Sequence, residues 1–253
     1  MAILSIGKTV LGEGIPKIIV PLMGNTTEQL VQEVNEVKRV KPDIVEWRVD
    51  VYEHVDQIEA VQAMISTLRK VLSDELLLFT FRSHKEGGNK EVPVSYYVEL
   101  LQAAIMTKKI DLVDVELFTG EKYVKELVET AEANGVYVIM SNHDFEKTPS
   151  KQEILTRLCK MQELGAHIPK IAVMPNGVED VITLLEATNT MKTNYADRPI
   201  ITISMGGKGL ISRLAGECFG SAATFGAGNQ ESAPGQIPVP ELRRALGTLH
   251  KFR

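Results

Sequence analysis

The stretch VYVIMSNHDFEKTPSKQEILTRLCKMQELGAHIPKIAVMP, residues 136–175, places one long amphipathic segment between two short apolar runs. The runs 136–143 and 169–175 are nearly continuous in apolar character, which is typical of strands buried on both faces of a sheet. The segment between them has helical periodicity, with Thr148 or Ser150 as a candidate N-cap and Gly165 as a stop signal. The stretch therefore predicts a strand–helix–strand unit.

Six more apolar runs of the same kind flank this stretch, and amphipathic segments separate them. The runs cover residues 17–23, 43–50, 76–82, 111–117, 200–205 and 218–226. Eight strand–helix units with no low-complexity linker predict one closed parallel (β/α)8 barrel, a single domain over residues 1–253. The preceding segment ILSIGKTVLGEG (3–14) predicts a short β-hairpin that caps the N-terminal end of the barrel.

Composition and charge exclude several classes of protein. The chain has 253 residues, 44% of them hydrophobic, and a formal net charge of -5 without a polybasic run, so nucleic acid is not an expected partner. Cys159 and Cys218 lie far apart and form no ligand-like pair, which predicts neither a disulfide framework nor a metal site. No run of 18 apolar residues and no signal peptide is apparent, so we expect no membrane association and a cytoplasmic location.

The chemistry of such a barrel is expected at the C-terminal ends of its strands. Lys170 lies inside the apolar run PKIAVMP, where an ammonium group costs several kcal/mol unless it is paired or loses its proton. A neutral lysine is the nucleophile that attacks a carbonyl to form an imine. The alternative is a structural lysine that is ion-paired with a barrel carboxylate such as Glu46 or Glu116.

His143 ends the run VYVIMSNH, at a position where an imidazole can exchange protons near neutral pH. Glu86, in the glycine-containing loop KEGG, is a candidate to orient His143 and to raise its basicity. The alternatives are a histidine that only binds a loop and a solvated loop glutamate.

Three arginines, Arg48, Arg82 and Arg213, come from separate parts of the chain but map to the same barrel mouth. Their number favours an anionic substrate, although some of them are also expected to pair with barrel carboxylates, as Arg48 with Glu46. The segment MGGKG (205–209) is either a phosphate-binding loop or a tight turn. The loop 227–240, which contains Ser232 and Gln236, is either a mobile lid or an ordinary surface loop.

The chain resembles the type I 3-dehydroquinate dehydratases of the shikimate pathway over essentially its whole length. The matching segments are EWRVD (46–50), LLFTFRS with KEGG (77–88), DVELF (114–118), VIMSNHDF (138–145), KMQELGAHIPKIAVMP (160–175), RPIITISMG (198–206), ISRLAGECFGSAATFG (211–226) and SAPGQI (232–237). The resemblance implies a hydro-lyase that converts 3-dehydroquinate into 3-dehydroshikimate through a lysine Schiff base, by syn elimination of water.

The resemblance also implies roles for particular residues. Lys170 is expected to form the Schiff base, His143 to act as general acid and base, and Glu86 to be its acidic partner. The residues expected to bind the substrate are Glu46, Arg48, Arg82, Arg213, Ser232 and Gln236. The resemblance implies no metal and no organic cofactor. It also implies a homodimer.

Two other functions stay open on the residues alone. One is a class I aldolase for a phosphosugar, which Lys170 and MGGKG favour. The other is a non-catalytic module that binds a small carboxylate with its arginines. Two arguments stand against the second: every residue of the proposed catalytic set is present, and a module that has lost its activity has no need to keep Lys170 unpaired.

Overall fold

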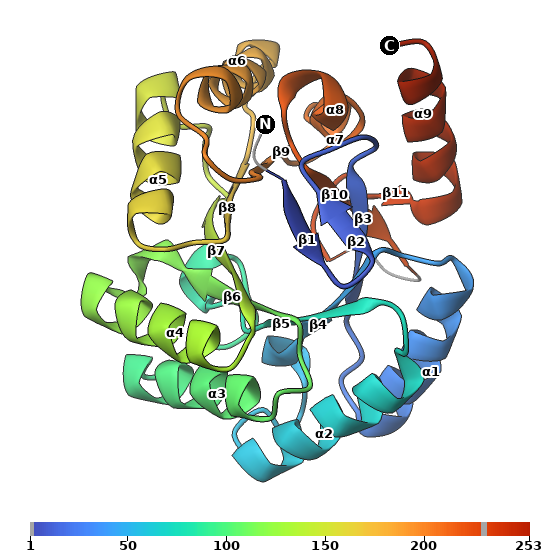
Figure 1. The fold of residues 1–253 in the computed structure, drawn as a ribbon, viewed down its shortest axis with the longest axis vertical. Helices are drawn as coiled ribbons and strands as arrows, with labels where there is room; N and C mark the ends of the chain where they lie inside the picture. The colour runs from blue at the N-terminus through green and yellow to red at the C-terminus, as the bar shows by residue number, and fades with distance from the viewer. Residues whose placement is uncertain (1–2, 229–231) are drawn as a thin grey trace.

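A ring of parallel strands surrounded by helices forms the body of the computed structural model, which describes residues 3–228 and 232–253 (Figure 1). The strands are β3 (Lys17–Leu22), β4 (Ile44–Arg48), β5 (Leu76–Thr80), β6 (Leu112–Glu116), β7 (Tyr137–Asp144), β8 (Ile168–Val173), β9 (Ile201–Ser204) and β10 (Ala223–Ala227). They pair in chain order from β3 to β9, β10 pairs with β3, and the short β11 (Ile237–Pro238) adds to β10.

The ring returns on itself between β9 and β10. Ile200 and Ser221 form an isolated parallel bridge there, and the Ala222 backbone N–H donates to the Ile200 carbonyl at 2.8 Å. The expected (β/α)8 barrel is therefore confirmed. One boundary was wrong: Cys218 belongs to the short helix α8 (Gly216–Phe219), which ends at Gly220 with a φ of 118°. The eighth strand begins only after that turn.

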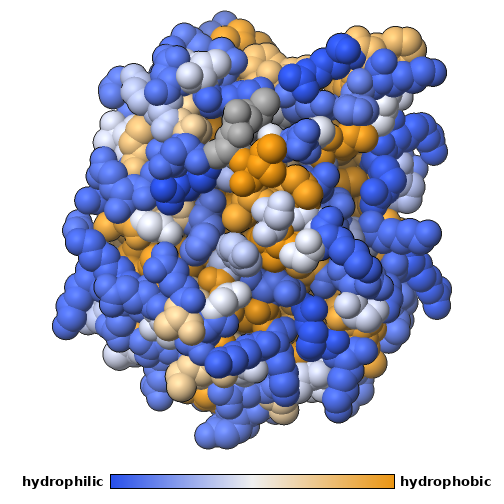
Figure 2. Space-filling model, viewed as in Figure 1, coloured by the Kyte–Doolittle hydropathy of each residue, from blue (hydrophilic) through white to orange (hydrophobic). Residues whose placement is uncertain are grey.

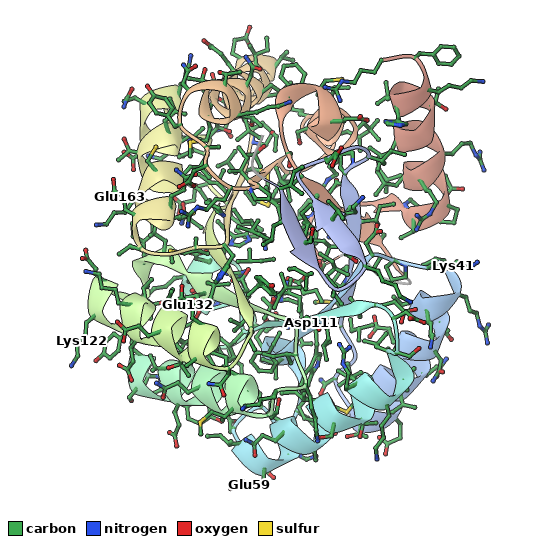
Figure 3. The ribbon with its side chains drawn as sticks, viewed as in Figure 1. Lys41, Glu59, Asp111, Lys122, Glu132 and Glu163 are labelled. Carbon is green, nitrogen blue, oxygen red and sulfur yellow. The ribbon has the colours of Figure 1, made fainter. Side chains whose placement is uncertain are left out.

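Helices cover the outer face of the ring. They are α1 (Thr27–Arg39), α2 (Ile58–Val71), α3 (Val94–Met106), α4 (Glu121–Ala133), α5 (Lys151–Glu163), α6 (Val178–Asn194), α7 (Leu210–Leu214), α8 and α9 (Val239–Lys251), with the single turns η1 (Val49–Val51), η2 (His84–Glu86) and η3 (Leu117–Thr119). Charged side chains such as Glu59 and Lys122 point away from the barrel (Figure 3). Among the described residues, no helix combines the length and apolarity needed to cross a membrane.

Local signals in the sequence explain where individual helices begin and end. Ser150 caps α5 by accepting a hydrogen bond from the Glu153 N–H, as predicted. Gly165, with a φ of 89°, follows the end of that helix. Because these signals fix both ends of α5, the flanking strands β7 and β8 emerge side by side, and both carry polar residues toward the barrel mouth.

The N-terminal hairpin closes the opposite end of the barrel. Strands β1 (Leu4–Ile6) and β2 (Thr9–Leu11) pair antiparallel, and Ile6 and Leu11 are buried against the first residues of several barrel strands, including Ile44 and Leu112. In Figure 1 the hairpin lies in front of the barrel opening, and Figure 2 shows an apolar area on this face among hydrophilic surface. The expected cap is confirmed, and any pocket in the barrel must open at the other end.

Candidate active site

A pocket of about 480 Å³ opens at the C-terminal ends of the strands, within the usual size range for a small-molecule site. All the residues that the sequence predicted for the site line it: Glu46 and Arg48 from β4, Arg82 and Glu86 from the segment after β5, His143 from β7, Lys170 from β8, Arg213 from α7, and Ser232 and Gln236 from the last loop. The barrel thus brings together residues separated by up to 190 positions in the chain.

Lys170 is buried, with 3% of its surface exposed, and its ammonium nitrogen lies 3.2 Å from Asp114 Oδ2. The ring of Phe225 lies on another side, with its centroid 4.8 Å from Nζ. The expectation of an unpaired Lys170 is therefore wrong, and so is the choice of Glu46 or Glu116 as its partner. Both of those carboxylates have other donors: Thr80 at 2.9 Å from Glu46, and Arg82 at 2.7 Å from Glu116.

Asp114 is the polar group on which this part of the site depends, and the sequence did not assign it a role. Its Oδ1 accepts hydrogen bonds from the Ser141 hydroxyl at 2.6 Å and lies 2.8 Å from Arg82 Nη2. Burial opposes ionisation, but the positive charges of Arg82 and Lys170 keep the pKa of Asp114 below its usual value. The signal was present in the D-x-E spacing of β6, which turns Asp114 and Glu116 to the same side of the strand.

His143 and Glu86 form a directly bonded pair. The ring Nδ1 and the backbone nitrogen of His143 each lie 2.9 Å from Glu86 Oε2. Burial, with the nearby charge of Glu116, raises the pKa of Glu86 to about 8. Burial and the positive charges of Arg82 and Lys170 hold the pKa of His143 well below its usual value. The imidazole itself is therefore neutral at neutral pH, while the carboxyl group bonded to it takes up a proton as the pH falls through about 8.

The loop that carries Glu86 needs its two glycines. Gly87 has a φ of 85°, and a side chain there would meet the ring of Phe145, which lines the pocket. A side chain on Gly88 would overlap the backbone of Arg82. The KEGG sequence therefore serves to fold Glu86 back against His143, and the phenylalanine packs against the turn.

The arginines differ in what they contact. Arg48 binds Asp50 through two hydrogen bonds, Nε to Oδ1 at 2.8 Å and Nη2 to Oδ2 at 2.9 Å, so the suggestion of Glu46 as its partner was wrong. The bidentate geometry explains the preference, because Asp50 lies beyond the end of the strand in line with the guanidinium fork. Arg213 is almost fully buried, and its Nη2 donates to the Pro234 carbonyl at 3.0 Å.

The segment MGGKG forms a tight turn after β9. A side chain on Gly209 would overlap the Ser204 carbonyl, and Lys208 Nζ donates to the Asn176 carbonyl at 2.8 Å instead of lining the pocket. The helix that follows, α7, has only five residues. This geometry favours the structural interpretation of MGGKG and removes one of the two arguments for a phosphosugar aldolase.

The last loop lies over this turn. Ser232 and Gln236 bind each other through two hydrogen bonds of 3.0 Å, and the Gly206 N–H donates to the Pro234 carbonyl at 3.0 Å. The predicted lid, 227–240, was drawn too long, because residues 237–238 form β11 and α9 begins at Val239. Residues 229–231 of that predicted lid lie outside the described residues.

Apolar side chains complete the walls of the pocket, and sequence reasoning did not identify them. Phe145, Ile203, Met205 and Phe225 line it beside the charged groups. The sequence placed these residues near the ends of predicted strands. Apolar residues are also expected at such positions as ordinary core residues, so nothing in the sequence indicated that they line a pocket. Only the fold distinguishes these residues from those of the core.

Comparisons with known proteins agree with one another. The model of the family described as type I 3-dehydroquinase matches residues 18–253. The 3-dehydroquinate dehydratase of Bacillus subtilis strain 168 is 64% identical over 251 residues, covering 99% of this chain and 98% of the relative. The counterpart in Bacillus velezensis is also 64% identical, with 99% of each chain covered.

Solved structures give the same picture. The type I 3-dehydroquinate dehydratase from Clostridium difficile, solved with covalently modified comenic acid, is 51% identical with a TM-score of 0.96, covering 99% of this chain and 98% of its own. The 3-dehydroquinate dehydratase from Geobacillus kaustophilus is 38% identical with a TM-score of 0.96, covering 99% and 97%.

Proposed function

The chain belongs to the type I 3-dehydroquinase family, and from this premise we propose that it eliminates water from 3-dehydroquinate through an imine on Lys170. The observation that carries the proposal is the arrangement of three groups in one pocket: a buried lysine, the aspartate beside it, and a neutral imidazole backed by a glutamate. This set suits carbonyl chemistry followed by proton transfer.

Lys170 supplies the covalent step. Its ammonium group releases a proton and the free amine adds to the C3 ketone. The carbinolamine hydroxyl then takes up a proton and leaves as water, so a protonated imine remains and the proton released at the start is accounted for. Both the initial ammonium and the protonated imine carry one positive charge on nitrogen. Asp114, ionised and 3.2 Å away, faces that charge before and after the step, so no uncompensated buried charge is created.

His143 carries out the proton transfers of the elimination. The neutral ring removes a proton from C2, and the electron pair moves into the iminium group to give an enamine. His143 then returns the proton to the C1 hydroxyl, which leaves as water while the enamine electrons form the C1–C2 double bond. Hydrolysis of the imine consumes one water and releases 3-dehydroshikimate, so the net change is loss of one water.

The remaining predicted residues are proposed to hold the substrate. The guanidinium of Arg213 matches a carboxylate, and Glu46, Arg48, Arg82, Ser232 and Gln236 offer donors and acceptors for its hydroxyl groups. Held in this way, the reacting atoms would gain rate from proximity and orientation. The Clostridium difficile relative, solved with covalently modified comenic acid, supports covalent chemistry in this family.

Trapping the imine tests the proposal. The protein is incubated with 3-dehydroquinate and sodium borohydride, and its peptides are mapped by mass spectrometry. We expect a reduced adduct on Lys170 in the unaltered protein and none in Lys170→Ala. Lys151→Ala is the matched control, because Lys151 is a surface lysine paired with Glu186. Tight substrate binding without adduct or turnover would instead support a non-catalytic binding module.

Two further expectations, a homodimer and a cytoplasmic location, stay predictions. Size-exclusion chromatography with light scattering tests the first, since one chain has a mass of 28.0 kDa. Fractionation of the source cells tests the second.

A further inference from the structure

Asn142 lies between the His143–Glu86 pair and Arg157, a residue of helix α5 on the outside of the barrel. It is the residue before His143 on β7 and only 4% of its surface is exposed. Its Nδ2 donates to Glu86 Oε1 at 3.2 Å, and its Oδ1 accepts from Arg157 Nη1 at 2.8 Å. A continuous chain of hydrogen bonds therefore runs from α5 to the carboxylate behind His143.

Arg157 is itself held on two sides. Its Nε donates to Glu153 Oε1 at 2.8 Å, one turn earlier on α5, and its guanidinium lies over the ring of Phe118 at 5.5 Å from the centroid. The guanidinium is therefore fixed in orientation before it reaches Asn142.

The guanidinium also fixes which way the amide of Asn142 faces. A guanidinium only donates hydrogen bonds, so the amide must turn its oxygen to Arg157 and its NH2 group to Glu86. An amide free to rotate would also present its oxygen to the carboxylate. Arg157 thus removes the orientation in which two acceptors would face each other.

This orientation sets the hydrogen bonding of both oxygens of Glu86. Oε1 receives the amide of Asn142, and Oε2 receives the backbone N–H of His143. A carboxylate surrounded by donors accepts the ring Nδ1–H as well, which leaves the other ring nitrogen of His143 unprotonated for the substrate.

We propose that Asn142 and Arg157 are positioning residues for proton transfer: Arg157 orients the Asn142 amide, and the amide keeps Glu86 as the acceptor that selects the reactive tautomer of His143. This inference rests on the proposed dehydratase function and assigns part of the same site to two residues that do not line the pocket.

Other charges also face Glu86, and they stay in place when Asn142 or Arg157 is changed. Arg82 Nη1, from the end of β5, lies 3.5 Å from Glu86 Oε2, and the carboxylates of Asp114 and Glu116 face it from β6. The hydrogen bond from Asn142 favours the ionised form of Glu86, as does Arg82, whereas Glu116 and Asp114 oppose it. Loss of the amide donor should therefore make the pair bind its proton more tightly.

The pH dependence of kcat tests the inference with four variants. Asn142→Asp is nearly isosteric and still accepts from Arg157, but it replaces the donor to Glu86 with a second carboxylate. Arg157→Ala frees the amide, whereas Arg157→Lys keeps a donor-only cation. Lys160→Ala is the control, because it removes a cation from the same helix that pairs with Glu121 and Glu163 and takes no part in holding Arg157 or Asn142.

We expect the acid-side midpoint of kcat to move upward by about 0.5 to 1 pH unit in Arg157→Ala, the size expected from loss of one hydrogen bond. Asn142→Asp should move the midpoint further, Arg157→Lys should restore it, and Lys160→Ala should leave it unchanged. Activity of the shifted variants should recover at high pH. Equal losses of kcat at every pH with an unmoved midpoint would overturn the inference.

The same samples separate this inference from the proposed function. Borohydride trapping should label Lys170 in every variant, because neither Asn142 nor Arg157 touches the lysine. No adduct and no turnover in the unaltered protein would contradict the dehydratase proposal itself. Normal trapping and turnover with unshifted pH profiles would contradict only the role of Asn142 and Arg157.

Discussion

Lys170 Nζ lies 3.2 Å from Asp114 Oδ2, and the other oxygen of that carboxylate is held by Ser141 and Arg82. The lysine proposed as nucleophile is thus paired in the resting protein with a fully buried carboxylate. This pairing lowers the desolvation cost of the lysine, and it fixes the direction in which the nitrogen enters the pocket.

Replacement of Asp114 by Asn should destabilise the protein strongly. Two buried cations, Lys170 and Arg82, would lose a compensating charge, and removal of one partner of a buried pair typically costs about 3–5 kcal/mol. Urea unfolding measures the change. Asp56→Asn is the control, since Asp56 forms an exposed pair with Lys90, and we expect less than about 0.5 kcal/mol there. Equal effects of both substitutions would contradict the prediction.

Replacement of His143 by Ala should separate imine formation from elimination. We expect kcat to fall by about 10²- to 10⁴-fold, because proton transfer loses its acid and base, while borohydride still traps the substrate on Lys170. His84→Ala is the control, since His84 is exposed and its ring Nδ1 lies 3.3 Å from the Gly88 carbonyl, away from His143. Loss of the adduct in the His143 variant would mean that the roles of the two residues are misassigned.

The activity should decline on the acid side of the pH range. The pKa of Glu86 is raised to about 8, so the His143–Glu86 pair takes up a proton as the pH falls through that region. The proton-accepting form is present above the raised pKa and is lost below it, by about tenfold per unit once well below. Steady-state kcat between pH 5.5 and 9.5 tests this, with circular dichroism to verify folding at each pH. A flat profile would show that the pair does not control the rate.

Replacement of Gly235 by Ala should weaken substrate binding. Gly235 has a φ of 78°, and a side chain there would lie 2.6 Å from the Gly206 carbonyl, so the loop carrying Ser232 and Gln236 must shift. We expect kcat/KM to fall about tenfold, mainly through KM, which is a change of about 1.4 kcal/mol. Gly247→Ala in α9 meets no atom within 4 Å and should leave kinetics unchanged. Unaltered KM in the Gly235 variant would show that the loop does not hold the substrate.

The strand order followed from the sequence because each barrel strand is buried on both faces. Runs such as 76–82 and 169–175 are therefore almost continuously apolar, and their helices carry ordinary caps. The one misplaced start, at Cys218, arose because Cys218 and Phe219, the last two residues of the short helix α8, are apolar and lie shortly before the strand. Periodicity does not distinguish such a segment from a buried strand.

The members of the site were predictable, but their pairing was not. Several carboxylates lie within reach of each long basic side chain. Which carboxylate a lysine or arginine pairs with depends on how far along the barrel axis each strand carries its acidic residue. Lys170 therefore pairs with Asp114, and Arg48 with Asp50, although the sequence suggested Glu46 or Glu116 as examples for the lysine and Glu46 for the arginine. The contact between Arg157 and Asn142 joins a helix surface to a strand end, and no short motif in the chain marks it.

The hairpin beneath the barrel has a consequence for how this protein can change over time. Ile6 and Leu11 seal the end where the strands begin, while the reacting groups lie where the strands end. Substitutions in residues 3–14 should therefore alter resistance to heat with little effect on turnover, and those in the loop that carries Ser232 and Gln236 should do the reverse. The hairpin and that loop can accumulate mutations almost independently, which leaves selection for rate and selection for durability free to act on different residues.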